Sequence, residues 1–168
     1  LGYGSTQAMA DAMVVEYNAT YQSIQKYDGF YIGRYELTGS TTTPTVQKGQ
    51  TVLRNQNWYQ LYKACKNVVV AGEEYGAQSE MIYGNQWDEV CSWLKTKGYD
   101  TDNNSASWGN YNNSTGAAAT NSGSKQTSGK NEAWKANNIY DLAGNCWEWT
   151  QEAYTTNGRV MRGGHCDG

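Results

Sequence analysis

Residues 138–150 read Asn-Ile-Tyr-Asp-Leu-Ala-Gly-Asn-Cys-Trp-Glu-Trp-Thr, and this stretch decides the fold. It combines apolar side chains, which favour burial, with Asn145 and Glu148, whose polar groups need water, a hydrogen-bond partner or a metal ion. Both demands fall within one short segment. The stretch therefore predicts either a tightly folded loop over a core or a ligand site.

The composition is rich in two kinds of aromatic residue. The chain has 168 residues, with 14 Tyr, 7 Trp and a single Phe. This length indicates one domain with at most a short appendage. Tyr and Trp offer a large flat surface with a polar tip, which suits a binding surface. Tyr can equally replace Phe in a wet, irregular fold, so composition alone leaves both interpretations open.

Charge and hydropathy argue against two classes of partner. The net charge is −3 and no basic stripe is present, which argues against a nucleic-acid partner. The longest apolar run, residues 68–71, is far shorter than the roughly 18 residues that span a bilayer, so no membrane insertion is expected. The first residues show no signal-peptide pattern. Because the chain starts at Leu1, we expect a processed or partial polypeptide.

The four cysteines are Cys65, Cys91, Cys146 and Cys166, and none belongs to a CxxC pair. An even number permits two disulfides, but a chain of this length does not need them. We expect free and mostly buried thiols. His165 is the single histidine, which excludes a zinc site built from several histidines.

Hydrophobic periodicity and turn residues predict the local structure. The predicted elements are a helix over 6–26, a strand over 30–37, helices over 55–67 and 86–97, and a short strand running into a glycine turn over 159–164, with loops at 38–52, 72–78 and 99–132. Ser5 or Thr6 is expected to cap the first helix, and Asp28-Gly29 to end it. The apolar stripe of that helix predicts a packing face or an oligomer contact; it consists of Met9, Met13, Tyr17, Tyr21 and Ile24.

The long loop at 99–132 carries Trp108 and Tyr111, which are expected to pin it to the core. In the predicted strand over 30–37, Arg34 and Glu36 fall on one face, which permits either a half-buried ion pair or a solvated strand end.

Several motifs resemble one protein family when they are taken in order. They are Gly-Phe-Tyr-Ile-Gly-Arg-Tyr-Glu at 29–36, two helices that carry Trp58 and Trp87, the opening stretch at 138–150, and Arg-Val-Met-Arg-Gly-Gly at 159–164. In this order and spacing the chain resembles the formylglycine-generating-enzyme-like family, also called the sulfatase-modifying-factor family, over about residues 29–164.

The resemblance implies an α+β fold of the C-type lectin type. The fold would have short twisted antiparallel strands, two helices and much irregular loop. Residues 1–28 would form an N-terminal helix and linker, and residues 29–168 the lectin-like domain. In this fold the first and last strands normally pair. We therefore expect the polypeptide to continue beyond Gly168, or another chain to supply the partner of the 30–37 strand.

The family includes sulfatase-activating oxidases, iron-dependent sulfoxide-forming enzymes and non-enzymatic binders, among them variable proteins of diversity-generating retroelements. The oxidases need a cysteine pair several residues after the Arg-Gly-Gly turn. Here Cys166 follows Gly164 by two residues and no second cysteine follows. The iron-dependent branch needs a histidine cluster, and His165 stands alone. We therefore expect a binder without catalytic residues; an oxidase is a weaker alternative.

The resemblance places the binding surface just after the Arg162-Gly163-Gly164 turn. The expected ligand-binding residues are Tyr154, Arg162, His165 and Asp167, with Trp108 and Tyr111 at the rim. The alternatives are structural: Arg162 pairs with Glu148 or Glu152, and Trp108 belongs to the core. The expected partner is a cell-surface protein or glycan, and the expected location is a virion, the cell surface or the extracellular space. A structural virion or surface-assembly component, joined through the N-terminal helix as a homo-oligomer or larger assembly, is the main alternative.

Calcium is the one cofactor that the resemblance implies. The matching ligands are the side chains of Asn145 and Glu148 and the backbone carbonyl of Cys146. Calcium needs six to eight oxygen ligands, so water or other loops must complete the set. The alternative is that Asn145 and Glu148 hydrogen-bond neighbouring backbone groups, and Glu148 is also open as a partner of Arg162.

Periodicity and resemblance together divide the opening stretch into two sets of residues. The expected core anchors are Ile139, Leu142, Trp147 and Trp149, and the expected turn residues are Gly144 and Asn145.

Overall fold

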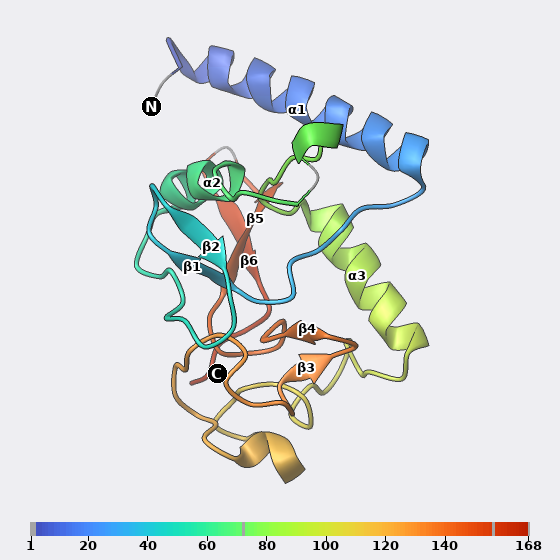
Figure 1. Ribbon diagram of the computed structural model, residues 1–168, viewed down its shortest axis with the longest axis vertical. Coiled ribbons are helices and arrows are strands. Elements are labelled where there is room, and N and C mark those ends of the chain that lie inside the picture. The colour runs from blue at the N-terminus through green and yellow to red at the C-terminus, as the bar shows by residue number, and fades with distance from the viewer. Residues whose placement is uncertain (1–2, 72, 156, 168) are drawn as a thin grey trace. The chain divides into compact units, whose positions relative to one another are not determined.

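The computed structural model describes residues 3–71, 73–155 and 157–167. The chain divides into two compact units, the first 32 residues and residues 33–168. The elements in chain order are α1 (Thr6–Tyr27), β1 (Leu37–Gly39), β2 (Pro44–Val46), α2 (Trp58–Lys66), the 3-10 helix η1 (Glu73–Tyr75), α3 (Gly84–Thr96), the 3-10 helix η2 (Gly116–Ala119), β3 (Lys135–Ala136), β4 (Ile139–Tyr140), β5 (Glu148–Ala153) and β6 (Arg159–Arg162) (Figure 1). This mixture of helices and small antiparallel sheets confirms the α+β class.

Helix α1 is the regular element of the first unit. The Ser5 hydroxyl accepts a hydrogen bond from the Ala8 amide at 3.0 Å, and this bond caps the first turn. Asp28 adopts a left-handed backbone with φ of 56° and ends the helix. The predicted helix and both of its boundaries are confirmed. No residue of α1 is buried, and no helix among the described residues is both long and apolar enough to cross a bilayer.

Among the described residues, the second unit contains three two-stranded antiparallel sheets. They pair β1 with β2, β3 with β4, and β5 with β6. In the last pair Glu148 lies opposite Arg162, and the register shifts between Trp149 and Ala153. β5 is the strand that contacts both α2 and α3. The Trp58 indole N–H donates to the Thr150 carbonyl at 2.8 Å, which ties α2 to this strand.

The predicted strand over 30–37 is wrong, because β1 begins only at Leu37. The preceding segment makes isolated contacts rather than a ladder. The Arg34 carbonyl accepts from the Tyr140 amide at 2.8 Å, and the Glu36 amide donates to the Ser128 hydroxyl at 2.9 Å. The segment at 38–52, expected to be a loop or an irregular edge, holds the end of β1 and the whole of β2, which pair as an antiparallel hairpin.

Both predicted helices of the second unit are confirmed, with shifted starts. Helix α2 begins at Trp58 because Asn57 and Gln60 form a reciprocal capping box. The Asn57 side chain accepts from the Gln60 amide, and the Gln60 side chain accepts from the Asn57 amide, both at 2.9 Å. Helix α3 ends at Thr96, and Gly98 with φ of 90° turns the chain away.

The core of the second unit holds the long loop in place. Trp108 is buried and its ring meets Tyr99 edge-on, with centroids 5.6 Å apart. The fully buried Trp134 donates its indole N–H to the Ala118 carbonyl at 2.7 Å. These contacts confirm that aromatic residues anchor the loop at 99–132.

Candidate functional site

Residues 141–146 form a buried turn, which we call the hub, at the centre of the second unit. Gly144 has φ of 82° and Asn145 has φ of 57°. A Cβ atom at Gly144 would lie 2.2 Å from the Asn110 carbonyl oxygen, so this position requires glycine. The prediction that Gly144 and Asn145 set the turn is confirmed. Ile139 and Leu142 are buried, as predicted.

Asn145 is fully buried and its side chain joins three distant segments. Its Oδ1 accepts from Asn110 Nδ2 at 3.0 Å and from the Gln126 amide at 2.8 Å. Its Nδ2 donates to Glu36 Oε2 at 2.6 Å and to the Gln126 carbonyl at 3.3 Å. The amide therefore uses all four of its hydrogen-bonding positions, which fixes the long loop against the hub.

Three carboxyl groups lie in or beside the hub, and each has an enclosed oxygen without a hydrogen-bond partner among the described residues. They are Glu36 Oε1, Asp141 Oδ1 and Glu148 Oε2. Burial raises the pKa of Glu148 to about 8, with a smaller contribution from Asp141. Burial raises the pKa of Asp141 to about 6, against the lowering effect of bonds from Gly129 and Ser128. The pKa of Glu36 is raised well above its usual range by burial and then by these two carboxyl groups.

The expected calcium ligands do not form a ready-made oxygen cage. Asn145 Oδ1 already accepts two N–H donors, and a calcium ion would have to displace both. Glu148 Oε2, by contrast, lacks a hydrogen-bond partner in the described part of the chain. The Asn145, Cys146 and Glu148 site therefore does not fit calcium without rearrangement, and calcium binding stays a prediction.

Arg162 forms ion pairs with two carboxylates that lie away from the hub. It donates to Glu152 Oε2 at 2.6 Å and lies 3.4 Å from Asp88 Oδ1. Glu152 is one of the two partners that the sequence left open. Both pairs link β6 to its neighbours, Glu152 on β5 and Asp88 on α3, and the part of Arg162 in ligand binding stays a prediction.

The prediction that Trp147 is a core anchor is wrong, because 53% of its surface is exposed. The hub residues before it are buried, and Glu148 after it directs an enclosed oxygen inward. The intervening side chain therefore faces outward, as alternation along an extended chain requires. Its ring lies against that of His165, with centroids 4.4 Å apart and planes tilted by 39°.

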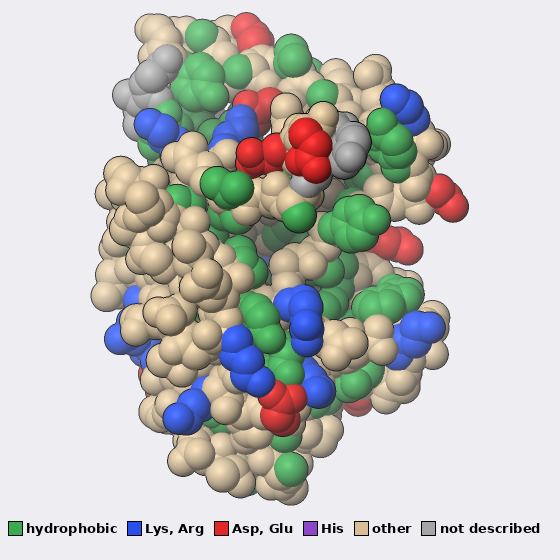
Figure 2. Space-filling model, viewed as in Figure 1, with side chains coloured by type: hydrophobic (Ala, Val, Ile, Leu, Met, Phe, Trp, Pro, Cys, Tyr) green, Lys and Arg blue, Asp and Glu red, His purple; other side chains and the backbone are tan. Residues whose placement is uncertain are grey.

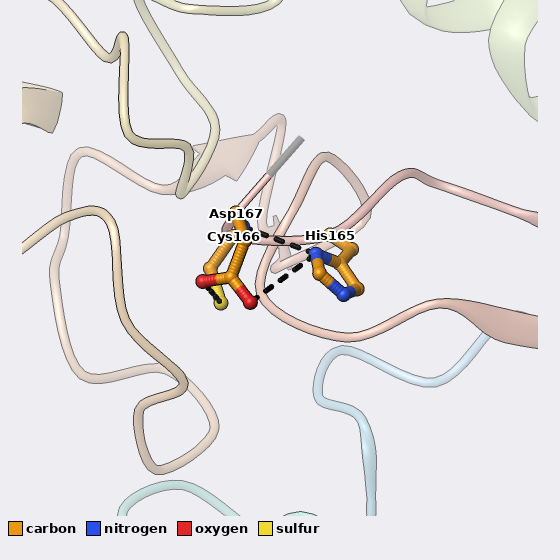
Figure 3. A group of neighbouring side chains, drawn as sticks. All are labelled: His165, Cys166 and Asp167. Atoms are coloured by element: carbon orange, nitrogen blue, oxygen red, sulfur yellow. Dashed lines mark hydrogen bonds and ion pairs between the residues drawn. The ribbon is translucent and has the colours of Figure 1, made fainter.

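The turn after Gly164 gathers three different polar side chains (Figure 3). They are His165, Cys166 and Asp167, and one ligand atom from each lies within 4.8 Å of the other two. Cys166 Sγ donates to Asp167 Oδ1 at 3.4 Å, and the Asp167 amide donates to His165 Nδ1 at 3.0 Å. The Cys166 amide donates to the Asn145 carbonyl at 3.3 Å, which connects this turn to the hub.

The chemistry of this turn favours binding over nucleophilic attack. Burial, followed by the neighbouring Asp167, raises the pKa of the Cys166 thiol. Burial likewise raises the pKa of Cys146 to about 12 and that of Cys65 to about 12. A protonated thiol is a weak nucleophile. All four cysteines are free thiols, and Cys146 and Cys166 are buried.

No family model, curated protein or solved structure matches the chain. The function must therefore follow from the geometry of the site itself.

The expected binding residues divide into surface and interior groups. Tyr154 is 74% exposed, Asp167 is exposed and His165 is half-buried. Trp108 is buried in the core, and the Tyr111 hydroxyl donates to the Gly163 carbonyl at 3.0 Å beneath the turn. Trp108 thus belongs to the core, whereas Tyr111 is half-buried, as His165 is, and its part in the binding surface stays a prediction.

The surface around the turn also includes Trp147 and Lys125, which sequence reasoning missed. Lys125 Nζ lies 3.7 Å from Asp167 Oδ2. Trp147 lies in the 138–150 stretch, but its apolar side chain led us to expect a buried residue rather than a surface residue. Lys125 carried no signal, since it lies in the irregular loop.

A second surface feature lies over β3 and β4, where Figure 2 shows Lys and Arg side chains gathered. Lys48 and Lys135 both pair with Glu132, and the Tyr140 hydroxyl donates to the same carboxylate at 2.6 Å. These bonds lower the pKa of Glu132 to about 2. The single carboxylate of Glu132 thus balances part of the positive charge here.

Proposed function

We propose that the chain is a non-catalytic ligand-binding domain of the formylglycine-generating-enzyme-like type, with a C-type lectin-like fold. It would be displayed on a phage or bacterial surface and recognise a cell-surface protein or glycan. The observation that carries the proposal is the exposed Trp147 ring, which lies against the tilted ring of His165 next to the buried hub. Together with Asp167 and Lys125 these residues form what we call the Trp147 surface.

The Trp147 surface combines the groups that recognition of a sugar or a protein loop requires. An exposed indole supplies a large flat contact area at low entropic cost. Asp167 and Lys125 place an acceptor and a donor beside it, 3.7 Å apart, which suits pairs of hydroxyl groups. The hub keeps the platform rigid, because the Cys166 amide is bound to the Asn145 carbonyl.

The arrangement of elements supports the family proposal. The β5–β6 hairpin leads directly into the turn at Gly163 and Gly164, whose φ values are 84° and 76°. The three residues that follow carry polar side chains, of which His165 is half-buried and Asp167 exposed. A rigid hairpin that presents a short polar turn is a suitable scaffold for binding residues.

Replacing Trp147 by Ala is expected to weaken ligand binding at least tenfold, because a central aromatic anchor contributes about 2 kcal/mol or more. The probe is a combined array of glycans and cell-surface proteins, with hits quantified by surface plasmon resonance. Trp93, which is 40% exposed on α3, supplies the matched control: Trp93→Ala should retain the affinity. An array without a hit, or a hit that Trp147→Ala still binds fully, would contradict the proposal.

A second candidate function is structural assembly through α1. This helix buries none of its residues and exposes large apolar side chains; these are Val14, Val15, Tyr17, Tyr21 and Tyr27. Apolar patches of this kind are typical of protein interfaces.

If α1 drives assembly, the chain should form a dimer or larger species at micromolar concentration in native mass spectrometry. Tyr21→Asp, at an exposed position of the apolar stripe, should shift this equilibrium at least tenfold toward monomer, because the charge would be buried at the interface. Asn18→Asp, at an exposed polar position of the same helix, is the control. A parent chain that stays monomeric would exclude assembly through α1 alone.

A further inference from the structure

We propose that His165, Cys166 and Asp167 form a binding site for one divalent transition-metal ion of the zinc class. The proposal stands on the geometry of these three residues, two of which, His165 and Asp167, also belong to the Trp147 surface. They are consecutive in sequence, yet the turn after Gly164 brings their ligand atoms within 4.8 Å of one another. Figure 3 shows the Asp167 carboxylate lying between the sulfur and the imidazole.

The separations between ligand atoms are close to those of a tetrahedral site. With metal–nitrogen and metal–oxygen bonds of about 2.0 Å and a metal–sulfur bond of about 2.3 Å, ligand atoms lie about 3.3–3.7 Å apart. Cys166 Sγ lies 3.4 Å from Asp167 Oδ1, and His165 Nδ1 lies 3.9 Å from Oδ2, the other oxygen of the same carboxylate. One ligand atom from each residue lies within 4.8 Å of the other two, so side-chain rotations must draw the three atoms closer when one ion binds.

The ligand types select the class of metal. A thiolate sulfur and an imidazole nitrogen favour zinc, cobalt or nickel over calcium and magnesium, which prefer oxygen. Three protein ligands leave a fourth tetrahedral position for water or another molecule. The site thus differs from the expected calcium site in its residues and in its chemistry.

The surroundings hold the three side chains in place. The Trp147 ring packs against the imidazole, and the Cys166 amide is bound to the Asn145 carbonyl. Asn112 Nδ2 donates to the Asp167 carbonyl at 3.4 Å. Such outer contacts orient ligands and raise metal affinity.

Metal binding releases the proton of the Cys166 thiol and breaks two weak contacts, one at His165 and one at Asp167. The ion replaces the proton of the Cys166 thiol, so that one proton is released to solvent for each metal ion bound. Nδ1 gives up the hydrogen bond from the Asp167 amide and directs its lone pair to the ion. Lys125, 3.7 Å from Asp167 Oδ2, is the competing cation that the metal displaces from the carboxylate.

Cobalt titration of the reduced chain under anaerobic conditions tests the site. Co²⁺ should bind with a stoichiometry of one, and should produce the near-ultraviolet thiolate-to-cobalt band together with visible bands of tetrahedral intensity. Equimolar Zn²⁺ should displace it. His165→Gln and Asp167→Asn should each weaken binding at least about tenfold, and Cys166→Ser should abolish the thiolate band.

Cys91→Ser, which removes a half-buried thiol of α3, is the matched control and should leave the titration unchanged. His165→Gln and Asp167→Asn alter residues with solvent contact, so they keep the test valid if Cys166→Ser does not fold. Absence of a thiolate band, or a band that persists in Cys166→Ser, would overturn the proposal. The titration measures metal binding by absorbance, whereas the array measures ligand binding to the Trp147→Ala variant. Either proposal can therefore fail without the other.

Discussion

Replacing Asn145 by Ala is expected to lower the free energy of unfolding by about 4 kcal/mol, since each hydrogen bond contributes about 1 kcal/mol and buried groups lose their partners. The change removes four side-chain hydrogen bonds; they join the hub to Asn110, Gln126 and Glu36. The total stability of a single domain is about 5–15 kcal/mol, so the variant would be close to unfolding. Urea denaturation followed by tryptophan fluorescence measures the loss.

Part of that loss comes from the backbone, because Asn145 has φ of 57°. Asn121, which is exposed and has φ of 63°, isolates this contribution. Asn121→Ala should cost only about 1 kcal/mol, the usual strain of a left-handed non-glycine residue. Asn145→Asp keeps the shape but replaces the donor to Glu36 by an oxygen, so it should also destabilise. Equal losses for Asn145→Ala and Asn121→Ala would show that the buried amide contributes little.

Stability is expected to fall as the pH rises from about 4 to about 8, which is the reverse of the usual behaviour of carboxyl groups. A group with a raised pKa in the folded state stabilises the fold fully below its unfolded pKa, and this stability is lost as the pH rises through the folded pKa. For Asp141 the window runs from 3.8 to about 6, and for Glu148 from 4.5 to about 8. A tenfold change in a proton-binding constant corresponds to about 1.4 kcal/mol, so Glu148 alone accounts for a change on the order of 4 kcal/mol.

At lower pH the dependence is reversed, and stability falls as the pH falls. The pKa of Glu132 is lowered from 4.5 to about 2 by bonds from Lys48, Tyr140 and Lys135. Its contribution is present above its unfolded pKa and is lost as the pH falls toward about 2. Maximum stability is therefore expected near pH 4–5. Urea midpoints measured from pH 3 to pH 9, with an unchanged m-value, would establish the profile.

Glu148→Gln should flatten the alkaline limb of this profile and raise the stability at pH 8 above that of the parent chain. Glu89→Gln, at an exposed position of α3, removes a surface carboxyl and is the control. The same urea denaturation, repeated with added Ca²⁺ or Mg²⁺, tests the expected calcium site. If Glu148 takes part in a calcium site, then Ca²⁺ but not Mg²⁺ should stabilise the parent at pH 8 and leave Glu148→Gln unaffected. A parent chain that is most stable at pH 8 in the absence of calcium would contradict the raised pKa values of Asp141 and Glu148.

Local signals predicted the helices and the hub turn. Periodicity of 3.6 residues found α1, α2 and α3, and the caps at Ser5 and Asp28 fixed the ends of α1. The Gly-Asn pair at 144–145 predicted a turn, and both residues have positive φ there. These features depend on residues that are close together in the sequence, so a single sequence is enough to predict them.

The features that failed depend on partners far away in sequence. Residues 30–36 form no strand, and their backbone groups bond singly to Tyr140 and Ser128, about a hundred positions away. The bond from Asn145 to Glu36 spans 109 positions, and hydrophobic patterns do not predict buried polar pairs. Trp147 shows the converse error, since apolar character predicted burial where the chain turns its side chain outward. The convergence of His165, Cys166 and Asp167 depends on the turn geometry rather than on residue order.

The anchoring of the loop at 99–132 has a consequence for its evolution. Buried side chains hold it at a few positions, among them Trp108, Asn110 and Ala118. Exposed positions between these anchors, such as Ser107 and Asn113, lie outside the core. Substitutions there leave the anchors intact, so this segment can accumulate sequence diversity while the frame beneath it is conserved by selection for folding.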